Sequence, residues 1–149
     1  MRVEIDQSGK LEQLNTPTIV AYANGKSGAT RLTAAAKRRI LHQLRRSLVP
    51  EKEVEAIWFA VVIFLLVKDL PQTATLVIDQ EYTGKEKIVE QSLTKLLQQQ
   101  SSGRWRGSIR FQRIGKHSPA HRLAWRARRG LSNIEVTKLS EDEVLKFLK

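Results

Sequence analysis

Residues 75–83, with the sequence TLVIDQEYT, constrain the fold more than any other part of the chain. The segment begins with an uninterrupted apolar run, Leu76, Val77 and Ile78, and Asp79 and Glu81 follow where that run ends. A helix-start pattern comes next. A short apolar run before a helix is typical of a strand that is buried on both faces, as in parallel sheets. We therefore predict an α/β fold in which both carboxylates lie at the C-terminal end of a central strand, where open α/β sheets bind their ligands.

The first predicted strand ends in the same way. Apolar and acidic residues alternate over residues 3–6, and the last of them is Asp6. If this strand runs parallel to the central one, both end at the same edge of the sheet, so Asp6 and Asp79 are expected to lie side by side. Two acids from distant parts of the chain that meet at a sheet edge are the strongest functional signal in the sequence.

The remaining predicted elements complete a mixed sheet with helices on both faces. Residues 18–23 are expected to form an antiparallel hairpin with the first strand and to end at Asn24 and Gly25. The following loop, residues 25–28, contains Gly-Lys-Ser but lacks the earlier glycine of a phosphate-binding loop, so we reject that interpretation. Further strands are predicted at 108–114 and 134–136, and helices at 33–48, 51–68, 84–100, 119–129 and after the capping box 140–143. We expect residues 1–149 to form one domain.

The chain carries a large excess of positive charge, with a formal net charge of +11 and a pI near 10.4. Of its 26 lysines and arginines, nine lie in residues 104–129 and six in residues 31–46, and neither window contains an acid. Such clustering favours a polyanionic partner, nucleic acid before a membrane surface. The alternative is a soluble protein that is merely basic. On the helix predicted at 33–48, we expect Lys37 and the neighbouring arginines to lie on solvated faces.

The candidate contacts to nucleic acid come from the first of these windows. They are Arg104, Arg106, Arg113, Lys116, His117, Arg122, Arg126, Arg128 and Arg129. Trp105 lies between two arginines, and two roles are open for it. It either stacks on a base or closes an edge of the hydrophobic core.

Several classes of protein are excluded. The chain has no cysteine, which rules out disulfides and thiolate metal sites. Its longest apolar run, residues 56–67, is too short to span a bilayer. The charged, strand-like first six residues do not resemble a signal peptide. We expect a cytoplasmic protein without a membrane partner.

Three short motifs resemble those of a known superfamily. Residues 3–9 (VEIDQSG) are similar to a first strand that ends in Asp-Glu-Ser-Gly, and residues 77–82 (VIDQEY) to a fourth strand with an aspartate followed shortly by a tyrosine. Residues 120–124 (AHRLA) resemble a last-helix motif, Ala-Asp-x-Leu-Ala. Together with the order of the predicted elements, these motifs resemble the ribonuclease H fold, the superfamily of ribonuclease H, Holliday junction resolvases and transposases. Fold similarity alone does not establish a function.

The resemblance implies metal-dependent hydrolysis of phosphodiester bonds. In that case Asp6 and Asp79 hold Mg²⁺ or Mn²⁺, with Glu81 as a neighbour or a substitute. Glu55, or else Glu53, stands for a glutamate that the superfamily carries on a helix. The alternative for both glutamates is that they only favour the positive end of the helix dipole.

The resemblance departs from its pattern at His121, which stands where the superfamily usually has a final aspartate. The implied role of His121 is that of a manganese ligand or a proton carrier near neutral pH. His117 could instead contact the scissile phosphate. The alternative for each histidine is a surface or helix-cap residue. A resolvase-like role further implies a homodimer.

Three hypotheses about function remain open. In the first, the protein is a nuclease acting on a structured nucleic acid. In the second, the fold is the same but the site is inactive, and the protein binds nucleic acid through its arginine-rich segment. In the third, the basic surface serves a protein or RNA assembly and the acids are structural.

Overall fold

The computed structural model describes residues 1–24, 26–131 and 133–148 of the chain. Within them, the strands are β1 (Arg2–Ser8), β2 (Thr18–Asn24), β3 (Lys26–Leu32), β4 (Thr75–Asp79), β5 (Ser108–Gln112) and β6 (Val136–Lys138). The helices are α1 (Ala34–Arg45), the short 3₁₀ helix η1 (Glu51–Glu53), α2 (Val54–Val67), α3 (Glu86–Gln100), α4 (Pro119–Arg128) and α5 (Glu141–Phe147). The predicted α/β class is confirmed.

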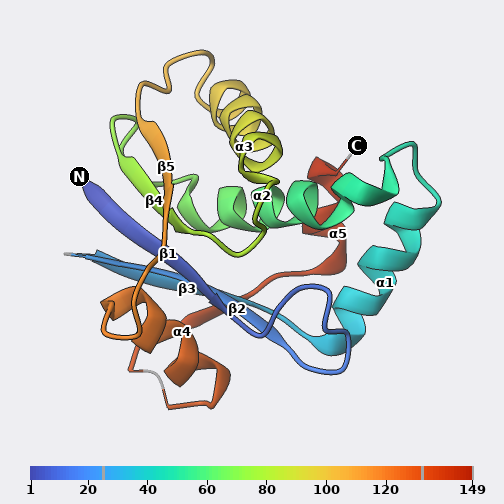
Figure 1. Ribbon diagram of the computed structural model, residues 1–149, viewed down its shortest axis with the longest axis horizontal. Coiled ribbons are helices and arrows are strands. Elements are labelled where there is room, and N and C mark those ends of the chain that lie inside the picture. The colour runs from blue at the N-terminus through green and yellow to red at the C-terminus, as the bar shows by residue number, and fades with distance from the viewer. Residues whose placement is uncertain (25, 132, 149) are drawn as a thin grey trace.

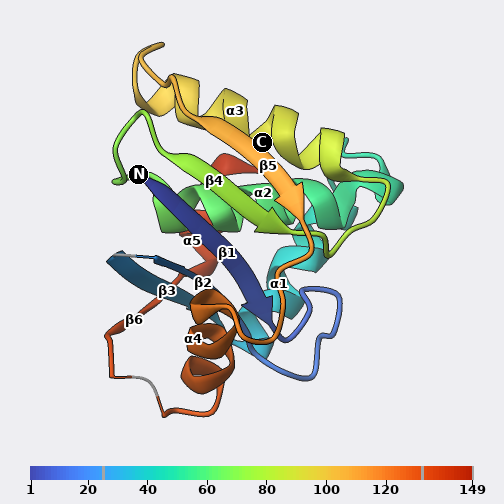
Figure 2. The same ribbon diagram turned by 60° about the vertical axis from the view of Figure 1, so that its left-hand side comes forward.

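The strands form one mixed sheet in the order β5-β4-β1-β2-β3-β6. Neighbours within β1, β2 and β3 are antiparallel, which confirms the predicted hairpin, and the other neighbouring pairs are parallel. In the parallel pair of β1 and β4, Ile5 lies opposite Ile78. The next residues are Asp6 and Asp79, so both acids lie at the edge of the sheet toward which β1 and β4 run (Figure 2).

Helices cover both faces of this sheet, as predicted (Figure 1). The apolar helix α2 lies on one face together with α3 and α5, and its buried residues include Trp58 and Phe59. Alternation along β1 directs Val3 and Ile5 into this core, where each buried side chain of that size contributes roughly 1.5–3 kcal/mol. None of the helices in the described ranges could cross a membrane.

The other face is covered by α4, which packs on β1 and β2. A smaller apolar cluster forms there, in which Ala124 and Ala127 of α4 contact Ile19 and Ala21 of β2. Asp6 pairs with Ala21 across β1 and β2 and therefore faces the side of α4. Small residues at this contact let the helix approach the sheet closely, which brings its first turn near the acids.

The third strand was missed by the sequence analysis, which treated residues 25–28 as a loop. Lys26, Ser27 and Gly28 belong to β3, whereas Gly25 lies outside the described residues. Gly28 pairs with Tyr22 of β2, and a Cβ at this position would stand 2.4 Å from Cε1 of the tyrosine ring. A glycine is therefore required here because the ring lies across it, and the same glycine makes the segment resemble a loop.

Capping side chains set the N-terminal ends of α1, α4 and α5. Thr33 accepts a hydrogen bond from the backbone N–H of Ala36, and Ser118 accepts one from Ala120 at the start of α4. Ser140 and Glu143 form the predicted capping box of α5. Several boundaries differ from the prediction. The helix expected at 51–68 begins with the separate turn η1, and the last strand lies at Val136–Lys138 rather than at 134–136. The helix expected at 33–48 ends at Arg45, the one expected at 84–100 begins at Glu86, and the strand expected at 108–114 ends at Gln112.

We expected Lys37 to lie on a solvated face of α1, but its side chain is completely buried. Its Nζ donates hydrogen bonds to the backbone carbonyls of Lys10, Gln13 and Thr16 at 3.0, 2.6 and 2.8 Å. The connection between β1 and β2 thus folds around one ammonium group. The helical pattern alone did not reveal this, because the partners are carbonyls that any residue carries.

Candidate metal centre at the sheet edge

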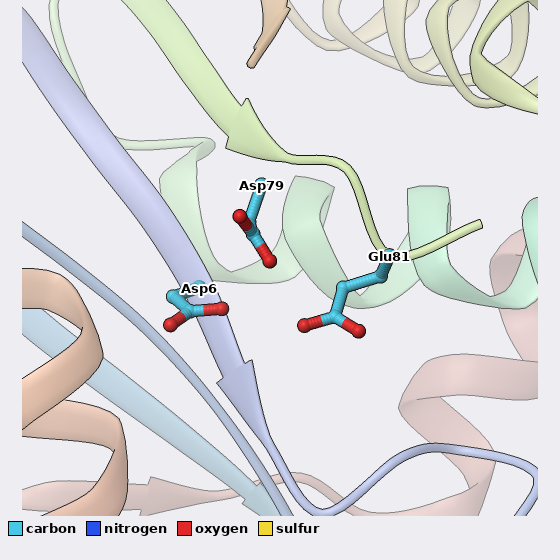
Figure 3. Close-up of side chains that lie close together, drawn as sticks. All are labelled: Asp6, Asp79 and Glu81. Carbon is cyan, nitrogen blue, oxygen red and sulfur yellow. The ribbon is translucent and has the colours of Figure 1, made fainter. Parts of the chain in front are cut away.

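Three carboxylates converge where β1 and β4 end. Asp6 lies near the end of β1, Asp79 is the last residue of β4, and Glu81 follows two residues later. One oxygen from each carboxylate lies within 4.8 Å of the other two. Figure 3 shows the three side chains around a common space between the two strand ends. The expectation that Asp6 and Asp79 meet is confirmed.

Asp6 is the most enclosed of the three and is 2% exposed. Its Oδ1 accepts a hydrogen bond from the backbone N–H of Gln7, and its Oδ2 lies 2.8 Å from Nδ1 of His121. Burial raises the pKa of Asp6 above its ordinary value; the bond to His121 lowers it, and the charge of Asp79 raises it. The carboxylate is thus held in one orientation by two donors.

Asp79 and Glu81 act as a pair. Oδ1 of Asp79 accepts a hydrogen bond from the backbone N–H of Ile114 at 2.7 Å, which ties the end of β4 to the segment after β5. Burial raises the pKa of Glu81 to about 7, and the hydrogen bond to Asp79 and its charge add to this shift. Two acids this close cannot both be ionised at low cost, so the metal-free pair retains a proton near neutral pH.

The donor set fits a hard divalent cation. Among the described residues, no lysine or arginine forms an ion pair with the three carboxylates, so their negative charge is left unneutralised. Gln7 is 6% exposed. Its Nε2 donates to the hydroxyl of Tyr82, and its Oε1 has no hydrogen-bond partner among the described residues. Carboxylate and amide oxygens are the ligands that Mg²⁺ and Mn²⁺ prefer. The residues present therefore suit either ion.

The cluster does not contain the helix glutamates that the resemblance implied. Within the described ranges, the acids that come together are Asp6, Asp79 and Glu81, without Glu53 or Glu55. This corrects the expectation for Glu55, which lies in the first turn of α2. The physical reason is that α2 packs on the face of the sheet opposite to Asp6. The alternative, that this glutamate serves the helix dipole, fits its position.

His121 is brought to the site, although it is not among the described residues whose ligand atoms all lie within 4.8 Å of one another. It contacts Asp6, and its role as a metal ligand stays a prediction. When Asp6 is ionised, its carboxylate only accepts hydrogen bonds, so in that state Nδ1 carries the proton and orients Asp6. The start of α4 is fixed by a second contact, in which the hydroxyl of Ser118 donates to Oε1 of Glu4 at 2.9 Å.

The predicted basic residues divide into two groups. The first group is exposed near the acids. Arg113, Lys116 and His117 lie in the connection between β5 and α4, in which the N–H of Ile114 donates to Asp79. Arg122, Arg126 and the C-cap residue Arg129 lie on α4, which begins at the site. Arg104 and Arg106 precede β5, at the opposite end of the strand, roughly 20 Å from the acids at 3.3 Å per residue. Arg128 is half-buried, with its guanidinium close to Gly9. The structure thus separates Arg104 and Arg106 from the edge that carries the acids, whereas Arg128 lies beside the segment that follows β1 at that edge.

Two residues of β5 were missed as candidates. Arg110 pairs with Val77 and Gln112 pairs with Asp79, and both are exposed. Alternation places them on the same face as Asp79, since Ile109 and Phe111 face the main core. The alternating sequence SIRFQRI contained this signal, but the neighbour of β5 was needed to interpret it.

The structure resolves the two roles left open for Trp105. Its side chain is 9% exposed and belongs to the main core. Its backbone is held by the hydroxyl of Ser101 and the side chain of Gln98. The core-edge alternative is therefore right, and base stacking is wrong for this residue. Trp125 on α4 is the exposed tryptophan, and no motif in the sequence pointed to it.

The edge of the sheet thus combines an unneutralised acidic cluster with exposed cations on β5, on the connection after it and on α4. Such an arrangement suits a ligand that carries negative charge and binds together with a divalent cation. The chain matches no model of a known protein family, and no curated protein sequence matches it either.

Proposed function

We propose that this protein has a ribonuclease H-like fold and is a metal-dependent nuclease that hydrolyses phosphodiester bonds in a structured nucleic acid. The observation that carries the proposal is the convergence of Asp6, Asp79 and Glu81 at the ends of two adjacent parallel strands, where no lysine or arginine among the described residues pairs with them. The order of strands and helices agrees with the one on which the resemblance was based. The proposal rests on this local chemistry rather than on the fold, which many functions share.

The three acids would hold Mg²⁺ or Mn²⁺, which supplies charge neutralisation at the phosphate and an activated water in reactions of this class. The protein contributes the orientation of the ligands. Asp6 is fixed by Gln7 and His121, and Asp79 by the backbone of Ile114. Such preorganisation matters because phosphoryl chemistry depends on small displacements of its ligands.

The exposed cations would bind the phosphates on both sides of the cleaved bond. Arg110 lies on the open part of the sheet beside β4, and Arg122 follows His121 directly on α4. Arg113 and Lys116 lie between these two positions along the chain. Each phosphate that they neutralise releases condensed counterions, so the affinity should fall steeply with salt.

A second candidate is a catalytically inactive nucleic-acid-binding domain of the same fold. One observation favours it, namely that the negative charge of the cluster is reduced without a metal. An oxygen of Asp6 already has a hydrogen bond to His121, and burial raises the pKa of Glu81 to about 7. In this case the arginines would supply nearly all of the affinity.

The test is a cleavage assay with Mg²⁺, Mn²⁺ or EDTA on single-stranded and duplex DNA, RNA, an RNA–DNA hybrid and a four-way junction. We expect metal-dependent cleavage by the wild type, and an Asp79→Asn variant that does not cleave but binds at least as tightly. Binding without cleavage under every condition would establish the inactive domain. Absence of binding to all of these substrates would remove both candidates and favour a scaffold.

A further inference from the structure

A cavity of about 450 Å³ lies beside α4, between this helix and the segment that follows it. Its walls include Arg122, Leu123, Trp125, Arg126 and Ile134. His121 faces Asp6; Leu123 and Arg126 lie on another flank of the helix, whereas Trp125 lies one turn after His121 on nearly the same flank, at 100° per residue. Among the described residues, the cavity is lined by neither His121 nor the three acids, although both sites are built on the same helix. Its volume falls in the range of sites that take small organic groups.

The aromatic wall of this cavity is unusual for the chain. Trp125 is 44% exposed, while Trp58 and Trp105 are 0% and 9% exposed. The guanidinium carbon of Arg129 lies 4.3 Å from the centroid of the Trp125 ring, so a cation–π contact holds the indole in place from one side. An exposed, fixed aromatic ring among cations is the arrangement that nucleic-acid-binding proteins use to stack bases.

The charges around the cavity select the same class of ligand. Arg122 and Arg126 are one helical turn apart and both exposed, and the sequence contains no acid from residue 91 to residue 134. The nearest acid along the chain, Glu135, is exposed and does not line the cavity. Leu123, Trp125 and Ile134 offer an apolar surface between these cations. A flat apolar group joined to phosphates matches both properties, and an unpaired nucleotide has this composition.

We propose that this cavity binds an unpaired base of the nucleic acid, with the ring of Trp125 stacked on the base and with Arg122 and Arg126 on its adjoining phosphates. This inference rests on the proposed function and adds that the substrate carries a single-stranded stretch beside the cleaved bond. Because Arg122 follows His121, the helix connects the two sites and sets the distance between the bound base and the acids.

The test uses the whole protein, with Asp79→Asn added to prevent cleavage, and an eight-nucleotide oligothymidylate. Trp125 is the most exposed tryptophan, so its fluorescence should be quenched on binding. We expect Trp125→Ala to weaken binding roughly 5- to 100-fold, the range for loss of one stacked base, with the salt dependence unchanged. Trp125→Phe should restore part of the affinity. The matched control is Leu131→Ala, which removes an apolar side chain that is 60% exposed but does not line the cavity.

An abasic oligonucleotide of the same length separates the base from its phosphates. The Asp79→Asn protein with an intact Trp125 should bind this abasic oligonucleotide about as weakly as the Trp125→Ala variant binds oligothymidylate. Equal affinity of both oligonucleotides, or an unaffected Trp125→Ala variant, would overturn the base site while metal-dependent cleavage by the wild type still supported the nuclease. Self-association that is lost in Trp125→Ala, measured by light scattering, would also overturn it and assign the cavity to a second copy of the chain.

Discussion

Nδ1 of His121 lies 2.8 Å from Oδ2 of Asp6, although the two residues are 115 positions apart in the chain. The side chain of Asp6 is 3% exposed and that of His121 is 36% exposed, so the bond is shielded on one side. It joins the first turn of α4 to the end of β1 on the face of the sheet that α4 covers. A charge-assisted bond of this kind fixes a carboxylate more firmly than a bond between neutral groups.

We therefore expect His121→Ala to lower the affinity for Mn²⁺ by 10- to 100-fold, the range for loss of a group that orients a metal ligand. His121→Asn should recover part of the loss, because its amide N–H can also donate to Asp6. Isothermal titration calorimetry measures both, with His42→Ala, an exposed histidine of α1, as the control. Tighter Mn²⁺ binding by His121→Ala would show that the imidazole competes with the metal.

Asp79→Asn should change stability in opposite directions with and without a metal. In EDTA, the substitution removes one of three converging negative charges, and the amide oxygen can still accept the hydrogen bond of Ile114, so we expect an equal or higher Tm. Mn²⁺ at 100 times its Kd should raise the wild-type Tm by about 5–10 °C, from about 2.7 kcal/mol of binding energy, and leave the variant unchanged. Thermal unfolding monitored by circular dichroism gives both values. A variant that loses Tm in EDTA would indicate a structural role for the acid.

The parts of the site that depend on strand ends could be predicted from the sequence. Asp6 and Asp79 each follow an apolar residue near the end of a strand, and parallel pairing of those strands is enough to bring them together. Glu81 was predicted as a neighbour of the metal ligands or a substitute for one of them, because its position depends on the turn after β4. Glu55 was expected at the acidic site and does not lie there, because the periodicity of α2 shows that the helix is buried but not which face of the sheet it covers.

Contacts made by single side chains over long distances were beyond the sequence. The burial of Lys37 depends on three carbonyls of one loop, and the burial of Trp105 depends on a neighbouring glycine, Gly107, whose Cβ would stand 2.4 Å from the ring. Neither partner has a side-chain signature. Trp125 is exposed because it lines the open cavity beside α4 instead of the contact of α4 with β2.

The location of the arginines leads to a prediction about salt dependence. Replacing Arg110 and Arg122 together by alanine should reduce the slope of log K against log salt by about 1.4 to 1.8, which corresponds to two phosphate contacts. The control is the double change of Arg104 and Arg106, which lie at the other end of β5 and should leave the slope unaltered. Fluorescence anisotropy over 50–200 mM salt measures these slopes. Equal losses in both variants would mean that the basic surface binds without reference to the acidic edge.

Lys37 should stabilise the fold through the connection between β1 and β2. Lys37→Met keeps the apolar stem but leaves the carbonyls of Lys10, Gln13 and Thr16 without their donor. Unpaired buried acceptors cost roughly 1–3 kcal/mol, so the free energy of unfolding should fall by about that amount at pH 7. Arg38→Ala is the control, because its exposed side chain donates to the carbonyl of Leu14 in the same connection and should contribute much less.

The stabilising effect of Lys37 should also depend on pH. Burial lowers the pKa of Lys37 from 10.5 to about 8, with the charge of Glu12 acting against this shift and that of Arg128 adding to it. Between these two values the unfolded chain binds a proton that the native protein has lost, so the wild-type free energy of unfolding gains from this group as pH rises. Lys37→Met lacks the group, and its deficit should therefore widen from pH 8 to pH 10. Urea unfolding at pH 7, 8, 9 and 10 measures the difference, and a deficit that shrinks over this range would show that the three carbonyls hold the ammonium form more strongly than burial opposes it.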